Sequence, residues 1–352
     1  MTRFDELFDL QTIDSHKRRL LEFWKGERKT VYSCFASSHA YHYNLRDLTD
    51  EQIIEGATAH LEAQASMPGF NIPAFQANYK PISIASYWGG RIIKGTGNHI
   101  ALEPIINRAA DIRGIRQPVL EGGDVDRAAG IWRKLSDALS TDGLGCTDLD
   151  MQGPLSTLSM LWKQDDLILS MYEAPEKVHS MLEMVTDFIL QIFDAMEDRI
   201  GKERMSGPFW PRIWLPREIG VELVEDFMPL LSPDLYKEFG LPYLKKISNK
   251  KGGIFFHCCG VFSQHYENLA KSKVNFIGLE YQYPFAKPDE LYDHFGSSMA
   301  FCPILSYRGW NDFSGRLDFF RYLTGSQFKG MRQWFTLDEG DKDMWQQLFK
   351  TI

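Results

Sequence analysis

Residues 252–305 read GGIFFHCCGVFSQHYENLAKSKVNFIGLEYQYPFAKPDELYDHFGSSMAFCPIL, and this stretch decides the fold. Three runs rich in β-branched and aromatic residues, at 252–258, 274–280 and 299–305, are separated by longer polar stretches. Strands that alternate with such connections are typical of βα units, whose strands lie parallel in one sheet. The stretch therefore predicts an α/β protein.

The rest of the chain continues this alternation. Further runs that read as strands lie at 31–37, 81–86, 146–151, 212–215 and 331–337. Together with the first three they make the eight strands that a closed (β/α)8 barrel requires. We predict a single TIM-barrel domain over residues 1–352, with an N-terminal helical segment at 1–30.

Helices are expected between these strands. Apolar residues recur at three- and four-residue spacing in 129–140, 165–201 and 233–250. Ser232 followed by Pro233 marks a helix start, because serine caps the free backbone N–H groups and proline suits the first helical position. Pro175 removes a backbone donor, so we expect it to interrupt its stretch.

Composition excludes several classes of function. The 352 residues are 44% hydrophobic and 24% charged, with a formal net charge of −8. An acidic chain is a poor match to a phosphate backbone. No run approaches the ~20 apolar residues that cross a bilayer, and the acidic first residues are unlike a secretory signal. We therefore expect a cytoplasmic protein that binds neither nucleic acid nor membrane.

The glycine-rich loops and the cysteines add two smaller points. No glycine motif of the phosphate-binding type follows a strand, so a nucleotide site is not supported. Few cysteines in a long chain fit reduced thiols better than a disulfide framework. They are Cys34, Cys146, Cys258, Cys259 and Cys302.

The reactive groups of parallel α/β barrels come from the carboxyl ends of the strands. His257 and Cys259 lie two residues apart at such an end, so they point to the same side, and Cys258 points to the other. Catalytic zinc takes three protein ligands and keeps one position open. Cys302 or Glu280 is the third donor that the sequence offers. Alternatively, both thiols are small buried apolar groups and His257 is a hydrogen-bonded core residue.

Other strand ends supply candidates for a pocket. Asp148 and Asp150 alternate with the pleat of their strand, so one of them can enter the pocket. We predict Asp150 and Glu280 as catalytic carboxylates. Aromatic walls suit an apolar substrate. The residues expected to line the substrate pocket are His39, Gln152 and Trp214.

In their order along the chain, these segments resemble the uroporphyrinogen decarboxylase superfamily. The resemblance is carried by TDLDMQGPLSTLSMLW at 147–162, by RIWLPREIGVELVEDFMPLLSPDLYKEFGLPYLKKI at 212–247, and by the HxCG segment and the strands that follow it at 255–305. It covers about residues 50–340. It implies a TIM barrel and, as barrels of this type often pair, a homodimer.

The superfamily that the chain resembles contains two chemistries. Its decarboxylases use an arginine-rich N-terminal stretch and a pocket aspartate, whereas VYSCFASSHAYHYNLRD at 31–47 lacks paired arginines and PISIASYWGG at 81–90 lacks an aspartate. Its methyltransferases bind zinc through the His and Cys of an HxC segment and a cysteine near the last strand. His257 and Cys259 match this pattern, but RQWFTLDEG at 332–340 has no cysteine.

The resemblance thus implies a zinc-dependent methyltransferase that moves a methyl group between a small-molecule donor or thiol and a corrinoid on a separate partner protein. Its Zn²⁺ would be held by His257, Cys259 and either Cys302 or Glu280. The alternative enzyme is a decarboxylase that acts on a porphyrinogen or another acid. The alternative outside enzymes is a non-catalytic binder of a small molecule or a corrinoid.

Overall fold

The computed structural model of the chain describes residues 3–36, 45–95, 99–208, 210–309, 311–341, 343 and 347–348. Its largest sheet has six strands, all parallel, in the order β1, β10, β9, β8, β7, β6. These strands are β1 (Thr30–Phe35), β6 (Val221–Val224), β7 (Ile254–His257), β8 (Phe276–Tyr283), β9 (Ala300–Leu305) and β10 (Arg332–Asp338). Two small sheets pair β2 (Ala74–Phe75) with β5 (Gly145–Cys146), and β3 (Ile92–Lys94) with β4 (Ile100–Leu102).

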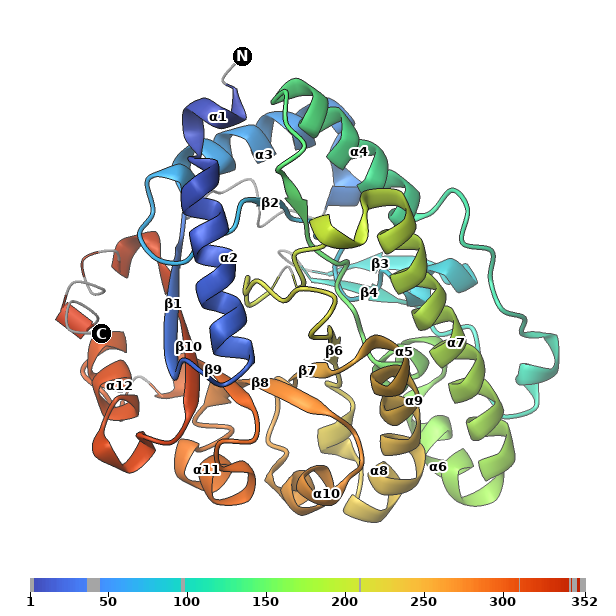
Figure 1. The fold of residues 1–352 in the computed structure, drawn as a ribbon. Coiled ribbons are helices and arrows are strands. Elements are labelled where there is room, and N and C mark those ends of the chain that lie inside the picture. Colours follow the sequence, from blue (N-terminus) through green and yellow to red (C-terminus); the bar gives the residue numbers. More distant parts are fainter. Residues whose placement is uncertain are drawn as a thin grey trace.

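Helices cover the outer face of the large sheet. Figure 1 shows α7 to α12 in an arc outside the strands. The helices are α1 (Phe4–Leu7), α2 (Leu10–Trp24), α3 (Asp50–Ala65), α4 (Asp124–Ala138), α5 (Pro154–Leu161), α6 (Gln164–Glu173), α7 (Pro175–Ile200), α8 (Pro233–Phe239), α9 (Leu241–Lys251), α10 (Tyr266–Lys271), α11 (Pro288–Phe295) and α12 (Arg316–Leu323). The sheet and its helices confirm the predicted α/β class.

Alternate residues of the strands face two different cores. Phe256 of β7 and Leu279 of β8 belong to the large core that the sheet shares with the outer helices. Phe255 of β7 and Ala300 of β9 belong to a second cluster on the inner face of the curved sheet. Because side chains alternate along a strand, His257, two residues after Phe255, also faces inward.

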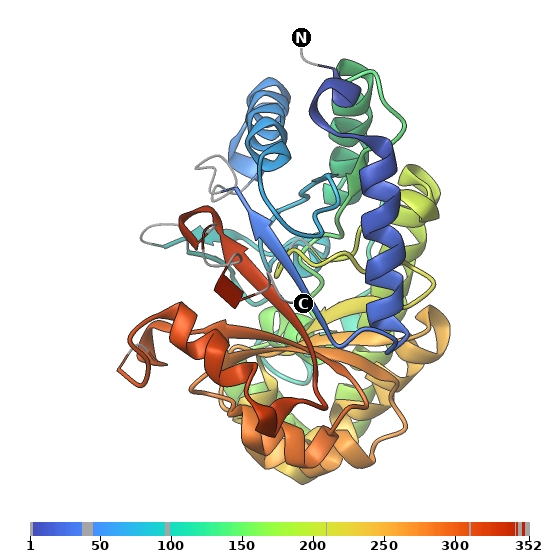
Figure 2. The same cartoon turned by 60° about the vertical axis from the view of Figure 1, so that its left-hand side comes forward.

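The helix α2 covers one end of this inner cluster. Leu20, Phe23 and Trp24 of α2 are all buried in it. The guanidinium of Arg332, the first residue of β10, donates to the carbonyl oxygens of Phe23 at 3.2 Å and Trp24 at 2.9 Å. The end that α2 covers is therefore the amino end of the strands, and Figure 2 shows this helix beside β1. The carboxyl ends of the strands lie opposite.

Several predictions from the sequence are confirmed. Strands β1, β7, β8, β9 and β10 overlap the predicted runs 31–37, 252–258, 274–280, 299–305 and 331–337, and β1, β8 and β10 extend one to three residues beyond them. The helix α4 (Asp124–Ala138) covers most of the predicted 129–140, and Pro175 begins α7 directly after the end of α6. The hydroxyl oxygen of Ser232 accepts a hydrogen bond from the backbone N–H of Leu235, and Pro233 begins α8.

Two predicted strands are wrong. Residues 81–86 form turns and part of a 3₁₀ helix, in which the backbone N–H of Ser86 donates to the carbonyl of Ile82. Residues 212–215 have no regular structure, and Ile213 and Trp214 fill the inner cluster instead. Both runs are apolar because they are buried, and burial alone does not distinguish a strand from a packed irregular segment.

Strand pairing among the described residues does not close the sheet into a continuous barrel. The segment 205–207 runs beside β5, where the backbone N–H of Ser206 donates to the carbonyl of Cys146 at 2.8 Å. The predicted strand 146–151 is regular only at Cys146 and rejoins the large sheet through one bridge, Gln152 to Val224 of β6. Between β1 and the segment before β2, the described residues form one antiparallel bridge, Ser33 to Gly69.

Candidate metal centre and inner hollow

Strand register brings the predicted metal residues to one level of the sheet. His257, the last residue of β7, is paired with Val224 of β6 on one side and with Glu280 of β8 on the other. Glu280 is in turn paired with Cys302 of β9. Paired residues of parallel strands point to the same face, so these side chains share the inner face of the sheet.

The imidazole of His257 is held on both sides. Its Nδ1 contacts Oε2 of Glu280, and its Nε2 lies 2.9 Å from Sγ of Cys259. Both His257 and Glu280 are buried. Burial lowers the pKa of His257, but the charges of Glu280 and Cys259 outweigh it, so the pKa lies well above its usual value. Glu280 therefore fixes the ring with Nε2 directed at Cys259.

A third ligand atom comes from Asp226, which follows β6. Its Oδ1 lies 3.7 Å from Nε2 of His257 and accepts a hydrogen bond of 2.8 Å from the backbone N–H of Cys259. The candidate ligand atoms of Asp226, His257 and Cys259 all lie within 4.8 Å of one another. We call these three residues the metal centre.

One side of the metal centre is open. Cys259 is exposed, and the side chain of Asp226 is 40% exposed. The amide nitrogen of Gln282 lies 3.7 Å from Sγ of Cys259 and donates to it, while burial raises the pKa of the Cys259 thiol. A ligand can therefore reach the centre from solvent, while Glu280 closes it from inside.

The two residues predicted as the third donor lie elsewhere. Glu280 contacts the far nitrogen of His257, and its Oε1 has no hydrogen-bond partner among the described residues. Cys302 is buried in the inner cluster, where burial raises the pKa of its thiol well above the usual value. Neither belongs to the group of converging ligand atoms. Cys258 packs in the large core, on the other side of its strand.

Below the metal centre lies a group of buried carboxylates. Asp150 accepts a hydrogen bond of 2.8 Å from the amide nitrogen of Gln152, and burial raises the pKa of Asp150 to about 6. Burial also raises the pKa of Glu222, on β6, well above its usual value, and the charges of Asp150 and Glu280 add to the effect. The predicted catalytic residues Asp150 and Glu280 thus lie near the centre without being among its ligand atoms.

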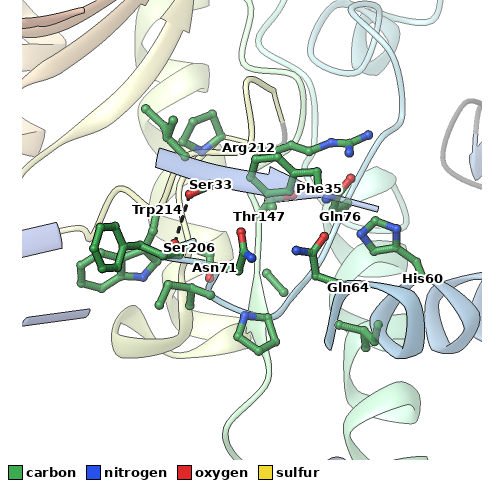
Figure 3. A pocket seen from close by; sticks show the side chains of 17 residues that line it. Ser33, Phe35, His60, Gln64, Asn71, Gln76, Thr147, Ser206, Arg212 and Trp214 are labelled. Carbon is green, nitrogen blue, oxygen red and sulfur yellow. Dashed lines mark hydrogen bonds between the residues drawn. The ribbon is translucent and has the colours of Figure 1, made fainter. Parts of the chain in front are cut away.

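A second polar region is a hollow between β1 and β2. Figure 3 shows it, with Trp214 on one side and His60 and Gln64 of α3 on the other. The space, open solvent included, is about 490 Å³. Of the three residues predicted to line a substrate pocket, Trp214 lines this hollow, Gln152 lies beside Asp150, and His39 is outside the described residues.

The sequence-based reasoning missed Asp226 and Glu222 because it missed β6. It placed a strand at 212–215, whereas the strand is VELV at 221–224. That run contains two valines and one leucine, and the acidic pair Glu225 and Asp226 follows it. The rule that functional groups follow strand ends would then have selected Asp226.

The fold and the site together define an α/β protein whose parallel sheet carries polar groups at the carboxyl ends of its strands. One solved structure with this fold is a methyltransferase from Methanosarcina mazei. It matches with a TM-score of 0.67 and 15% sequence identity over 91% of this chain and 92% of that one. At this identity the likeness shows the fold.

A second solved structure is provisionally described as a vitamin-B12-independent methionine synthase from Listeria monocytogenes. It matches with a TM-score of 0.46 and 12% identity over 97% of this chain and 92% of that one. Neither a protein-family model nor a curated protein matches the sequence. In the part of the chain that the structure describes, no helix is long and apolar enough to cross a membrane.

Proposed function

We propose that the protein is a zinc-dependent methyltransferase that moves a methyl group between a small-molecule donor or thiol and a corrinoid protein. The observation that carries the proposal is the convergence of Asp226, His257 and Cys259 at the carboxyl ends of β6 and β7. The shared fold with the methyltransferase from Methanosarcina mazei supports it at the level of architecture.

The donor atoms of the metal centre suit zinc. One imidazole nitrogen, one thiolate and one carboxylate oxygen are ligand types that zinc accepts, and three protein ligands leave one position open. Zinc bonds of about 2.0–2.3 Å at tetrahedral angles place ligand atoms roughly 3.2–3.8 Å apart. The 3.7 Å between His257 and Asp226 is in this range, and Sγ of Cys259, at 2.9 Å from Nε2, would need to move outward.

Residues around the centre would prepare it for this metal. Glu280 holds Nδ1 of His257, so Nε2 is left to bind; a carboxylate behind a histidine ligand is the usual arrangement in zinc sites. Asp226 fixes the backbone of Cys259, and Gln282 donates to its sulfur. Bound zinc would lower the pKa of a thiol at the open position and so supply a thiolate for methyl transfer.

The open side of the centre favours a large partner. Cys259 and Asp226 are exposed, while Glu280 and His257 are buried, so a reactive group carried by another protein would approach from solvent. A corrinoid protein is such a partner. The methyl group would move between its cobalt and the sulfur or other heteroatom of the small molecule.

Metal analysis of four variants tests the proposal. We expect about one zinc per chain in the wild type and in Cys302→Ala, and almost none in Asp226→Asn, His257→Ala or Cys259→Ala, because each of these removes a ligand. Zinc-loaded protein should also demethylate methylcobalamin in the presence of a thiol, followed by absorbance. If Cys302→Ala loses zinc while Asp226→Asn keeps it, the third ligand is wrong. If no variant affects zinc or methyl transfer, the proposal fails.

A further inference from the structure

We propose that Gln282 of β8 is a positioning residue of the metal centre, and that its amide limits the charge that the sulfur of Cys259 gives to a bound metal. The inference rests on the metal site of the proposed function, and it does not depend on methyl transfer or on a corrinoid partner. It adds a role for β8, a strand that supplies none of the three converging ligand atoms.

Strand pairing places Gln282 beside Cys259. β7 ends at His257, which is paired with Glu280 of β8. Cys259 and Gln282 stand two residues further along each chain, and β8 continues as a regular strand to Tyr283. The amide nitrogen of Gln282 lies 3.7 Å from Sγ of Cys259 and donates to it. The two side chains therefore meet one step beyond the level at which Glu280 contacts His257.

The backbone of Gln282 is held, although its side chain is partly exposed. The residue is paired with Ile304 of β9, and its carbonyl accepts a hydrogen bond of 3.1 Å from the backbone N–H of Ala286. The next residue, Tyr283, donates from its hydroxyl to the carboxylate of Asp312 at 2.9 Å. A functional side chain on a regular strand is held more precisely than one on a loop. The amide is thus directed at the sulfur before a metal binds.

A hydrogen bond to a cysteine sulfur changes what that sulfur gives to a metal. The sulfur binds metal as the thiolate, and an N–H group that donates to the thiolate takes up part of its negative charge. Hydrogen bonds to coordinating sulfurs are one of the means by which proteins adjust metal sites. Less charge on Sγ of Cys259 leaves the metal more electron-poor. A thiolate at the open position is then held more tightly.

Glu280 and Gln282 act on neighbouring ligands in opposite directions. The carboxylate of Glu280 contacts Nδ1 of His257, and a carboxylate in this place makes an imidazole a stronger donor. The amide of Gln282 makes the thiolate of Cys259 a weaker one. Because residues two apart on a strand point to the same face, β8 presents both groups to the centre. One strand therefore adjusts two of the three ligands.

The charge of the ligand set explains why a donor at the sulfur matters. One thiolate and one carboxylate, from Cys259 and Asp226, cancel the double positive charge of zinc. A thiolate that arrives at the open position therefore adds a net negative charge, close to the buried carboxyl groups of Asp150 and Glu280. Of the described side chains, only that of Gln282 donates to Sγ of Cys259 from outside the ligand set.

The test compares three side chains at position 282 in protein loaded with Co²⁺, which takes the same types of ligand as zinc. Absorption in the near ultraviolet reports charge transfer from thiolate to cobalt, and its wavelength falls as the sulfur becomes less electron-rich. Gln282→Leu removes the donor, and Gln282→Lys offers a charged donor, which binds a thiolate more strongly than a neutral amide does. We expect the longest wavelength in Gln282→Leu, an intermediate one in the wild type and the shortest in Gln282→Lys.

A thiol titration measures the consequence at the open position. 2-Mercaptoethanol would be added to each cobalt-loaded protein, and its binding followed by the growth of the same absorption. Gln282→Leu should bind this thiol about two- to tenfold more weakly than the wild type, the factor that one hydrogen bond typically supplies. Gln282→Lys should bind it at least as tightly as the wild type, because the donor is restored.

Gln264→Leu is the matched control. Gln264 lies five residues after Cys259, and its exposed amide donates to the carbonyl of Pro229 at 3.2 Å instead of to the sulfur. This variant should keep the wavelength and the thiol affinity of the wild type. A general loss of shape around the centre would move Gln282→Leu and Gln282→Lys in the same direction, whereas donation to the sulfur moves them in opposite directions.

The outcomes separate this role from the proposed function. Equal wavelengths in the wild type and both variants at position 282, a shift of both variants in the same direction, or an equal shift in Gln264→Leu would overturn the role of Gln282 and leave the metal centre standing. If the wild type takes up no cobalt, the metal centre is wrong, and this inference falls with it. The expected order of wavelengths without any transfer of methyl from methylcobalamin would support Gln282 and count against the methyltransferase alone.

Discussion

The metal centre and the hollow are two polar regions that are built in different ways. At the metal centre, His257 and Glu280 are paired residues of β7 and β8, so regular strand register places them together. In the hollow, polar groups come from α3, from irregular segments and from the ends of short strands, and Gln64 takes over hydrogen bonds that a strand would make. Backbone pairing between strands is enough to bring His257 and Glu280 together. The hollow, by contrast, depends on hydrogen bonds made by particular side chains such as Gln64.

The electrostatics of the two regions also differ. Carboxylates surround His257, where Asp150, Glu222 and Glu280 are buried. The described lining of the hollow contains Arg212 and no carboxylate. Because low dielectric strengthens the field of buried charges, the metal centre favours cations, whereas the described lining of the hollow has no carboxylate that would attract one.

The largest effect, on the free energy of unfolding, should come from replacing Gln64, whose side chain makes hydrogen bonds to the backbone of β1 and Ala36. Gln64→Ala leaves the buried carbonyl of Cys34 and the buried N–H of Ala36 without partners, and each such group costs roughly 1–3 kcal/mol. We expect the free energy of unfolding to fall by about 2–4 kcal/mol, measured by urea denaturation. The matched control is Gln52→Ala, which removes an exposed helix-capping contact to Thr49 and should cost about 1 kcal/mol or less. Equal losses in the two variants would mean that Gln64 does not support β1.

A smaller effect, on zinc affinity, is expected at the metal centre, where strand pairing already places Glu280 beside His257. Glu280→Gln keeps the shape of the side chain but weakens its hold on Nδ1 of His257, and loss of such a carboxylate typically lowers metal affinity 10- to 100-fold. Competition with a chromogenic chelator would measure the zinc affinity. Cys302→Ala, which changes a buried neighbour of Glu280 in the same register, is the control and should leave the affinity unchanged. If Glu280→Gln binds zinc as tightly as the wild type, the carboxylate does not orient the ligand.

The same difference explains what could be predicted from the sequence. His257 and Glu280 lie on strands with clear patterns of branched and aromatic residues, and Cys259 follows the first of them, so both strands and their shared level were predictable. Asp226 was missed because VELV is short and the neighbouring RIWL, equally apolar, was taken as the strand. Arg212 could not be placed, because an irregular segment has no periodicity that fixes where its side chains point.

The smallest effect concerns the histidine of the hollow and appears as a dependence of stability on pH. The folded-state pKa of His60, about 3, lies below the value of about 6.5 expected in the unfolded chain, so the unfolded state binds more protons between these values. Stability should be complete above about pH 6.5 and be lost as pH falls from there toward 3, with a slope that approaches 1.4 kcal/mol per pH unit near pH 5.

Replacing the histidine isolates this contribution. In His60→Gln no ring can take up the proton, so between about pH 4.5 and 5.5 the free energy of unfolding should fall less steeply than in the wild type, by roughly 1.3 kcal/mol per pH unit. Above pH 7.5 the two slopes should coincide, because the ring is neutral in both states, and this range is the internal control. Denaturant titrations across the pH series measure both. Parallel slopes at pH 5 would show that the ring gains a proton without unfolding, and a cationic His60 would then stand beside Arg212 in the hollow.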